Sequence, residues 1–177
     1  MSIKSKIRTI PDYPIEGIMF RDISTLLADP MGLNEVVTKL AQRYSNNKYD
    51  FEYIVGIEAR GFIVGAALAY ALNKGFIMIR KSGKLPGKII SEDYQLEYGT
   101  DQIEMHEDAF AKGSKIILFD DLLATGGTML GAANLIEKLG GRIEEMAVVI
   151  NLPDIGGEAK LKEAGYQVSY LCEFEGD

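Results

Sequence analysis

Residues 116–130, which read IILFDDLLATGGTML, decide the fold of this chain. The stretch opens with apolar residues of the types found in a strand that is buried on both faces. Two acids follow, Asp120 and Asp121, and a turn of small residues then opens a helical pattern that ends at Gly140-Gly141. A buried strand that leads through a short turn into a helix is typical of a crossover unit in a parallel sheet.

The same alternation continues on both sides of that stretch. Apolar runs predict strands at Tyr53–Ile57, Phe76–Ile79, Lys115–Phe119, Ala147–Asn151 and Gln167–Leu171, and helical patterns cover Leu33–Tyr44, Phe62–Leu72, Thr128–Leu139 and Glu158–Ala164. This alternation predicts an α/β fold, with a parallel sheet core flanked by helices on both faces. Because the chain has 177 residues and no low-complexity linker, we expect a single domain over residues 1–177.

Two stretches interrupt the alternation, namely residues 8–29, which are punctuated by prolines, and the polar residues 81–106. Ligands of open parallel sheets bind beyond the carboxyl ends of the strands. Irregular segments are common there as covers and lids, so we expect both stretches to border the binding site.

Composition and charge exclude several classes of protein. The 19 Lys and Arg residues against 26 Asp and Glu residues give a net charge of −7, which disfavours binding to nucleic acid or to anionic membranes. The lone cysteine and the lone histidine, Cys172 and His106, provide neither a disulfide nor a zinc site. No apolar run reaches the roughly 18 residues of a membrane span, and Met1–Ile10 lacks the core of a signal peptide. We therefore expect a cytoplasmic protein.

The turn formed by Ala124, Thr125, Gly126, Gly127 and Thr128 has the composition of a phosphate-binding loop. Its glycines let backbone N–H groups converge on an anion, and the start of the following helix adds unpaired donors and partial positive charge. The threonine hydroxyls add further donors. Neither GxxxxGK[ST] nor GxGxxG occurs and no lysine follows the glycines, which favours a monophosphate over a polyphosphate.

Asp120 and Asp121 would repel a phosphate in that loop unless they faced a sugar diol or a cation. A phosphorylated ribose meets both demands, because its 5′-phosphate can occupy the loop while its 2′ and 3′ hydroxyls donate to the acids. The alternative is a solvated turn with glycines for tightness. That alternative explains Gly126 and Gly127 but not two acids and two threonines in this order.

This order of strand, paired acids and Thr-Gly-Gly-Thr loop resembles the phosphoribosyl pyrophosphate signature of the type I phosphoribosyltransferases. Further motifs resemble the adenine-specific branch of that family: Gly17–Ser24 (GIMFRDIS), Gly56–Phe62 (GIEARGF), Arg80–Gly87 (RKSGKLPG) and Leu96–Gly99 (LEYG). The resemblance implies a hood at about residues 8–29 and a mobile catalytic loop at about residues 81–106. The implied reaction belongs to purine salvage and transfers the phosphoribosyl group to adenine, giving AMP and pyrophosphate.

The resemblance also implies how the pyrophosphate is held. Arg60 follows a strand and precedes a helix, so that its guanidinium could bind the pyrophosphate and act in catalysis. Arg80, Lys81, Lys84 and Lys88 form a basic cluster. In this family the stretch that contains Arg80, Lys81 and Lys84 binds pyrophosphate partly across a dimer interface, so a homodimer is expected. The alternative for this cluster is a solvated strand end.

The base site is expected in the hood. Phe20 is suited to stack on adenine, with backbone groups near Met19 and Arg21 at the edge of the base and Leu122 against its other face. The alternative for Phe20 is burial in the core.

Glu97 is expected to be catalytic, either by stabilising positive charge on the ribose or by moving a proton at the purine. The alternative for Glu97 is a surface hairpin position. The expected cofactor is Mg²⁺, held by substrate oxygens and water without a direct protein ligand. Two other functions stay open: transfer to another base such as xanthine or hypoxanthine, and a non-catalytic sensor of phosphoribosyl pyrophosphate.

Overall fold

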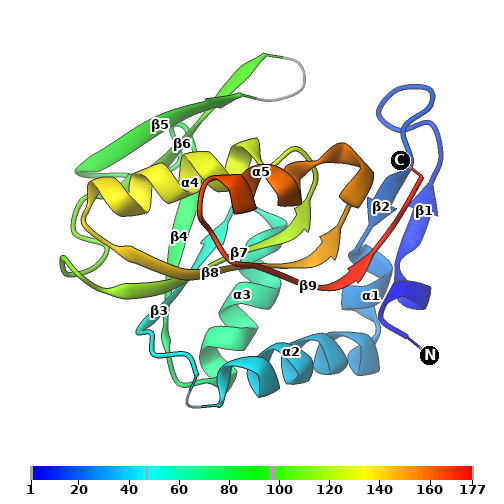
Figure 1. Cartoon of the computed structure of the whole chain (residues 1–177), viewed down its shortest axis with the longest axis horizontal. Coiled ribbons are helices and arrows are strands. Elements are labelled where there is room, and N and C mark those ends of the chain that lie inside the picture. The colour runs from blue at the N-terminus through cyan, green and yellow to red at the C-terminus, as the bar shows by residue number, and fades with distance from the viewer. Residues whose placement is uncertain (1, 47, 96–98, 177) are drawn as a thin grey trace.

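The computed structural model describes residues 2–46, 48–95 and 99–176. Within them, a sheet of seven strands runs in the order β5-β6-β4-β3-β7-β8-β9 (Figure 1). Its parallel part consists of β4 (Gly75–Lys81), β3 (Tyr53–Ile57), β7 (Lys115–Leu123), β8 (Arg142–Asn151) and β9 (Val168–Glu173). The expected α/β fold with a mostly parallel central sheet is confirmed.

Helices cover both faces of this sheet (Figure 1). One face carries α2 (Pro30–Tyr44) and α3 (Arg60–Ala71), and the other carries α4 (Gly127–Lys138) and α5 (Gly157–Glu163). Strand β7 is buried between them, because Ile117 and Phe119 pack in the cluster with α2 and α3, while Ile116 and Leu118 pack in the cluster with α4. Hydrophobic burial on both faces explains why its sequence is continuously apolar.

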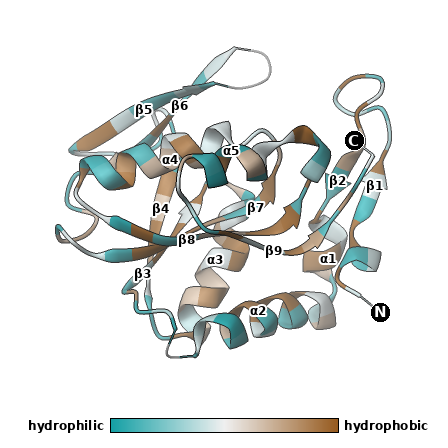
Figure 2. Ribbon diagram, viewed as in Figure 1, coloured by the Kyte–Doolittle hydropathy of each residue, from teal (hydrophilic) through white to brown (hydrophobic). Residues whose placement is uncertain are grey.

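Helix α2 begins earlier than the expected Leu33. The Asp29 side chain accepts a hydrogen bond from the backbone N–H of Met31 at 3.0 Å, and Pro30 takes the first helical position. The Asp-Pro pair therefore starts the helix. Figure 2 shows hydrophilic and hydrophobic residues mixed along α2, as expected for a helix that buries one side against the sheet.

The polar stretch 81–106 is more regular than expected. It contains β5 (Ile89–Gln95) and β6 (Thr100–His106), which form an antiparallel hairpin that extends the sheet beyond β4. Ile90, Glu92 and Tyr94 face α4, where Glu92 accepts hydrogen bonds from the side chains of Asn134 and Lys138. The alternation of apolar and polar residues that marks a strand is hidden in β5, because the charged Glu92 occupies a position that faces α4.

The N-terminal segment forms a separate two-stranded sheet beside the carboxyl ends of β7, β8 and β9 (Figure 1). Its strands β1 (Arg8–Ile10) and β2 (Phe20–Asp22) pair antiparallel, and η1 (Lys4–Lys6) and α1 (Ser24–Ala28) flank them. Ile3, Ile7, Ile23 and Leu26 are buried in the core cluster of α2 and α3. A further short helix, η2 (Pro153–Ile155), joins β8 to α5. No helix in the described ranges is long and apolar enough to span a bilayer.

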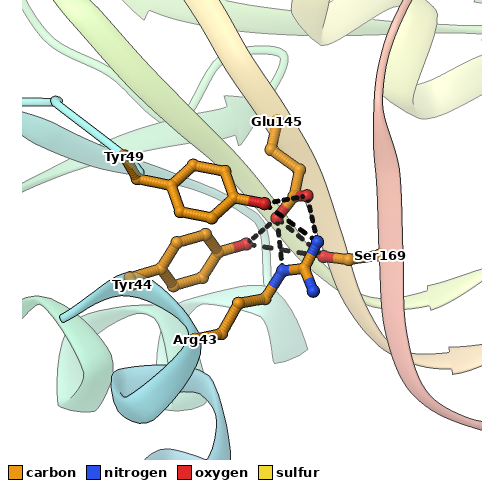
Figure 3. A network of polar contacts seen from close by, with 5 residues as sticks. All are labelled: Arg43, Tyr44, Tyr49, Glu145 and Ser169. Atoms are coloured by element: carbon orange, nitrogen blue, oxygen red, sulfur yellow. Dashed lines mark hydrogen bonds and ion pairs between the residues drawn. The ribbon is translucent and has the colours of Figure 1, made fainter. Parts of the chain in front are cut away.

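A buried carboxylate connects α2 to β8 and β9 (Figure 3). Glu145 is only 1% exposed and accepts hydrogen bonds from Arg43 Nε (2.9 Å), Tyr44 Oη (2.5 Å), Tyr49 Oη (2.9 Å) and Ser169 Oγ (2.9 Å). Burial alone would raise the pKa of Glu145, but these donors outweigh it and hold the pKa below its ordinary value. The ionised carboxylate therefore stabilises the packing of α2 on the sheet.

We predict that Glu145→Gln lowers the free energy of unfolding by about 2 kcal/mol at neutral pH, because the amide removes the charge that these donors stabilise. Since folding lowers the pKa, the carboxylate stabilises the fold above its unfolded pKa, and this stabilisation is lost as the pH falls through the folded pKa. Urea unfolding should show the difference shrinking below about pH 4. Glu144→Gln, at the neighbouring position where the register between β7 and β8 shifts, is the control, and an equal loss there would contradict the prediction.

Candidate active site

A cavity of about 650 Å³ opens at the carboxyl end of β7, beside the hood. Its walls contain Ile18, Met19, Phe20, Arg21, Arg60, residues 120–126, Thr128, Met129, Leu152 and Ile155. The structure thus brings the residues assigned to the base, the ribose and the 5′-phosphate into one place. Ile18, Met129, Leu152 and Ile155 also line it, although the sequence patterns did not single them out.

The phosphate-binding loop passes from β7 into α4 through two glycines. Gly126 has φ +78°, in the left-handed region that favours glycine, and α4 starts at Gly127. A β-carbon at Gly127 would lie 2.2 Å from the carbonyl oxygen of Gln95, at the end of β5. Glycine is therefore required for the hairpin to lie against the start of α4, whose first N–H groups have no helical acceptor.

Helix α5 supports this loop from behind. The backbone N–H of Gly157 donates to the carbonyl oxygen of Ala124 at 2.9 Å, and a β-carbon on Gly157 would lie 2.1 Å from that oxygen. The contact leaves no room for a side chain. Sequence reasoning missed it, although Gly156-Gly157 after β8 repeats the signal of Gly126-Gly127 after β7, a strand followed by two glycines and a helix.

The two acids near the end of β7 are neighbours, Asp121 buried and Asp120 half-buried. Asp121 is 4% exposed and pairs with Arg60, whose Nε lies 2.8 Å from Asp121 Oδ2, and the Asp121 N–H donates to Asp120 Oδ1 at 2.8 Å. Burial, followed by repulsion from Asp121, raises the pKa of Asp120 well above its ordinary value. Burial also raises the pKa of Asp121, although Arg60 opposes that rise. Both acids are thus held in a site that penalises their charge.

The base side of the cavity is formed by the hood. The Phe20 ring packs edge-on against Tyr13 at a centroid distance of 5.1 Å, and the Arg60 guanidinium lies 5.5 Å from its centroid. Phe20 therefore borders the cavity rather than the core. The Arg21 side chain contacts Thr9 Oγ1 at 2.8 Å and packs over the Phe174 ring at 4.6 Å.

Arg80, Lys81 and Lys84 do not belong to the described residues that line this cavity. Arg80 pairs with Glu58 at 3.2 Å, and the Lys81 ammonium pairs with Asp101. Lys84 is exposed. Within one chain, acids from other elements therefore pair with Arg80 and Lys81, whereas Lys84 is exposed to solvent.

Glu97, the residue expected to be catalytic, lies outside the described residues. Among those that are described, no group of three or more His, Cys, Asp or Glu side chains is arranged to hold a metal ion.

Comparisons with known proteins identify the family of this chain. A family model of the phosphoribosyl transferase domain matches residues 23–173. The chain is 62% identical to the adenine phosphoribosyltransferase of Chlorobium phaeobacteroides over 177 residues, which is 100% of both chains.

Solved structures show the same relationship. The adenine phosphoribosyltransferase of Thermoanaerobacter pseudethanolicus superposes with a TM-score of 0.92 at 44% identity, covering 97% of this chain and 98% of that chain. The Saccharomyces cerevisiae enzyme, in complex with D-2,5-dideoxy-2,5-imino-altritol 1,6-bisphosphate and adenine, superposes with a TM-score of 0.88 at 36% identity, covering 96% of each chain. The chain therefore belongs to the adenine phosphoribosyltransferases of the type I phosphoribosyltransferase family.

Proposed function

We propose that the cavity at the end of β7 is where this chain carries out its reaction. The chain is a pentosyltransferase of purine salvage, which transfers the phosphoribosyl group of phosphoribosyl pyrophosphate to adenine and releases AMP and pyrophosphate. The observation that carries the location is the meeting of the Asp120-Asp121 pair, the phosphate-binding loop and Phe20 in one cavity. The lone, half-buried Cys172 supports a cytoplasmic location.

The ribose phosphate fits the side of the cavity formed by β7 and α4. The loop from Ala124 to Thr128 offers backbone N–H groups, two threonine hydroxyls and the positive end of α4 to the 5′-phosphate. Asp120 and Asp121 accept hydrogen bonds from the 2′ and 3′ hydroxyls. These hydroxyl donors would stabilise the ionised acids. In the protein alone, Arg60 offsets only part of the cost of burying the Asp121 charge.

Adenine fits between the hood and the end of β7. Phe20 covers one face of the base and Leu122 the other, and backbone groups near Met19 and Arg21 hydrogen-bond to its edge. The Arg21 guanidinium is already engaged with Thr9 and Phe174, which is consistent with recognition through the backbone. A carbonyl oxygen in place of the 6-amino group would leave a buried backbone acceptor without a donor, so a 6-oxopurine is rejected.

In the reaction, adenine N9 forms a bond to C1′ while the bond from C1′ to the pyrophosphate oxygen breaks. The electron pair of that bond leaves with pyrophosphate, whose charge Arg60 neutralises from the start of α3. Adenine loses its N9 proton in this step: either Glu97 accepts it, or a pyrophosphate oxygen accepts it while Glu97 stabilises the positive charge on the ribose. Exclusion of water from the cavity would protect C1′, which water would otherwise attack.

The donors in the cavity are compatible with Mg²⁺. Asp120 and Asp121 provide carboxylate oxygens, which are hard ligands of the kind this ion prefers, but two acids alone do not form a cage. The residues therefore fit an ion held chiefly by substrate oxygens and water. Bound in this way, Mg²⁺ would supply charge neutralisation to the leaving pyrophosphate.

We also propose a homodimer that completes the pyrophosphate site. Ile63 and Tyr70 on one side of α3 are 48% and 89% exposed, and Met78 on the adjacent β4 is 45% exposed. Exposed apolar side chains gathered on neighbouring elements are typical of a protein interface. Because Arg80 and Lys84 do not line the cavity of their own chain, a second copy is the natural route by which they would contribute to catalysis.

The test of the activity is a panel of bases incubated with phosphoribosyl pyrophosphate and Mg²⁺, with nucleotide and pyrophosphate release as readouts. Adenine should turn over at least about 100-fold more efficiently than hypoxanthine or xanthine, because only adenine satisfies the backbone groups of the hood. Chelation by EDTA should abolish turnover. Efficient use of hypoxanthine without adenine turnover would overturn the assignment.

Asp120→Asn should lower kcat/KM for phosphoribosyl pyrophosphate by about tenfold or more and at the same time raise the Tm. Because folding raises the pKa of Asp120, the fold is favoured while the carboxyl is protonated and is destabilised as the pH rises through the folded pKa. The gain in Tm should therefore be larger at about pH 8 than at about pH 5. Asp108→Asn, at an exposed position, serves as the control. Unchanged kinetics would remove Asp120 from the ribose site.

Gly157→Ala should raise KM for phosphoribosyl pyrophosphate by about tenfold and leave KM for adenine within about twofold. The added β-carbon would collide with the Ala124 carbonyl and displace the phosphate-binding loop, while Phe20 stays in place. Steady-state kinetics measure both constants. Ala159→Gly weakens the same helix without touching the loop, and a similar effect there would show that only α5 stability matters.

A further inference from the structure

A buried carboxylate on β6, that of Glu104, forms hydrogen bonds with the turn that follows β4. Glu104 is 4% exposed, and its Oε1 accepts a hydrogen bond from the Gly83 N–H at 2.9 Å. The Ser82 hydroxyl lies within donating distance of both Glu104 Oε1 (3.0 Å) and Gln102 Oε1 (2.9 Å). The ladder between the two strands pairs Arg80 with Glu104, and the Ser82 N–H donates to the Gln102 carbonyl at 3.1 Å. The Glu104 side chain therefore holds the chain at the point where it turns away from the sheet.

His106 holds the other end of the same turn. It lies two residues further along β6, on the side that Glu104 occupies, and its Nε2 is 2.9 Å from the Pro86 carbonyl oxygen. The Glu107 N–H donates to the Lys88 carbonyl at 3.2 Å. Both ends of the segment 82–88 are thus fastened to one strand.

The turn between these contacts carries the basic residues toward solvent. Gly83 has φ +78°, and with this backbone its N–H donates to Glu104. Arg80 Nη1 donates to the Lys84 carbonyl at 3.4 Å, so the backbone of the turn also contacts the guanidinium. A shift of the turn would therefore move both Arg80 and Lys84.

The contribution of Glu104 depends on its acceptor rather than on its charge. Only Oε1 is used, because Glu104 Oε2 is buried without a hydrogen-bond partner in the described part of the chain. An uncharged side chain that keeps the acceptor at the same place should therefore hold the turn equally well.

We propose that Glu104 is a positioning residue, which sets the place from which Arg80 and Lys84 reach the pyrophosphate group by fixing the Ser82-Gly83 turn. The proposal rests on the proposed function in one respect, namely that this basic segment binds pyrophosphate. It adds a residue of β6 that touches neither substrate but determines the geometry of a group that does.

The experiment compares Glu104→Ala with Glu104→Gln by steady-state kinetics and amide hydrogen exchange. Glu104→Ala should raise KM for phosphoribosyl pyrophosphate and the inhibition constant of pyrophosphate about tenfold, with KM for adenine within about twofold. Amides of residues 82–87 should exchange faster, because the turn has lost its acceptor. Glu104→Gln should match the parent in both measurements. Glu92→Ala is the matched control, since that carboxylate of the same hairpin binds Asn134 and Lys138 of α4 instead.

Three results would overturn the proposal: unchanged exchange in Glu104→Ala, faster exchange with an unchanged KM for phosphoribosyl pyrophosphate, or a glutamine variant as impaired as the alanine variant. If Glu104→Ala does not fold, Ser82→Ala takes its place, because it removes one of the two donors and should give the same changes at smaller size. Lys84→Ala distinguishes a failure of the pyrophosphate assignment from a failure of the proposed role of Glu104. If it leaves KM for phosphoribosyl pyrophosphate unchanged, the pyrophosphate assignment fails, whereas exchange in Glu104→Ala still reports whether Glu104 holds the turn.

Discussion

The placement of two adjacent carboxylates, one buried and one half-buried, near the end of β7 is the constraint around which the site is arranged. A strand covered on both faces has no polar surroundings until its carboxyl end, so Asp120 and Asp121 lie where ionisation is disfavoured. Arg60 compensates one of them from the start of α3. Hydroxyl groups of a bound ribose would donate hydrogen bonds to these carboxylates. Ribose binding would therefore reduce the electrostatic cost of holding the two acids away from water.

Close contacts at three glycines fix the positions of the loops around Asp120 and Asp121. Gly61 of α3 approaches Asp120, where a β-carbon would lie 2.9 Å from Oδ1, and Gly127 and Gly157 approach Gln95 and Ala124 more closely still. Each of these glycines lies in the first turn of a helix. The first turns of three helices therefore pack so closely against neighbouring segments that no side chain fits between them.

The parts of this arrangement that depend on local sequence were predictable. The buried strand β7, the loop from Ala124 to Thr128 and the α/β alternation follow from hydrophobic runs and glycine positions, which are properties of neighbouring residues. The hairpin of β5 and β6 entered only as the alternative for Glu97, because Glu92, which faces α4, and the buried Glu104 occupy positions where a hydrophobic pattern predicts apolar residues.

The partners of charged side chains were not predictable in the same way. Arg80 and Lys81 read as free cations in the sequence, yet Glu58 and Asp101 reach them from other parts of the sheet. Gly157 acquires its importance from a contact with Ala124, far away in the chain. Such pairings depend on the order of the strands, which a single sequence does not specify.

The contact between Arg21 and Phe174 couples the hood to the edge of the sheet. Phe174 is buried, its N–H donates to the Asn151 carbonyl at 3.0 Å, and its ring packs against the guanidinium of Arg21. Phe174 directly follows β9, the strand at one edge of the seven-stranded sheet. Local opening of that edge would therefore withdraw a support of the hood and loosen the adenine side of the cavity, while the phosphate side, built on β7 and α4, would stay in place.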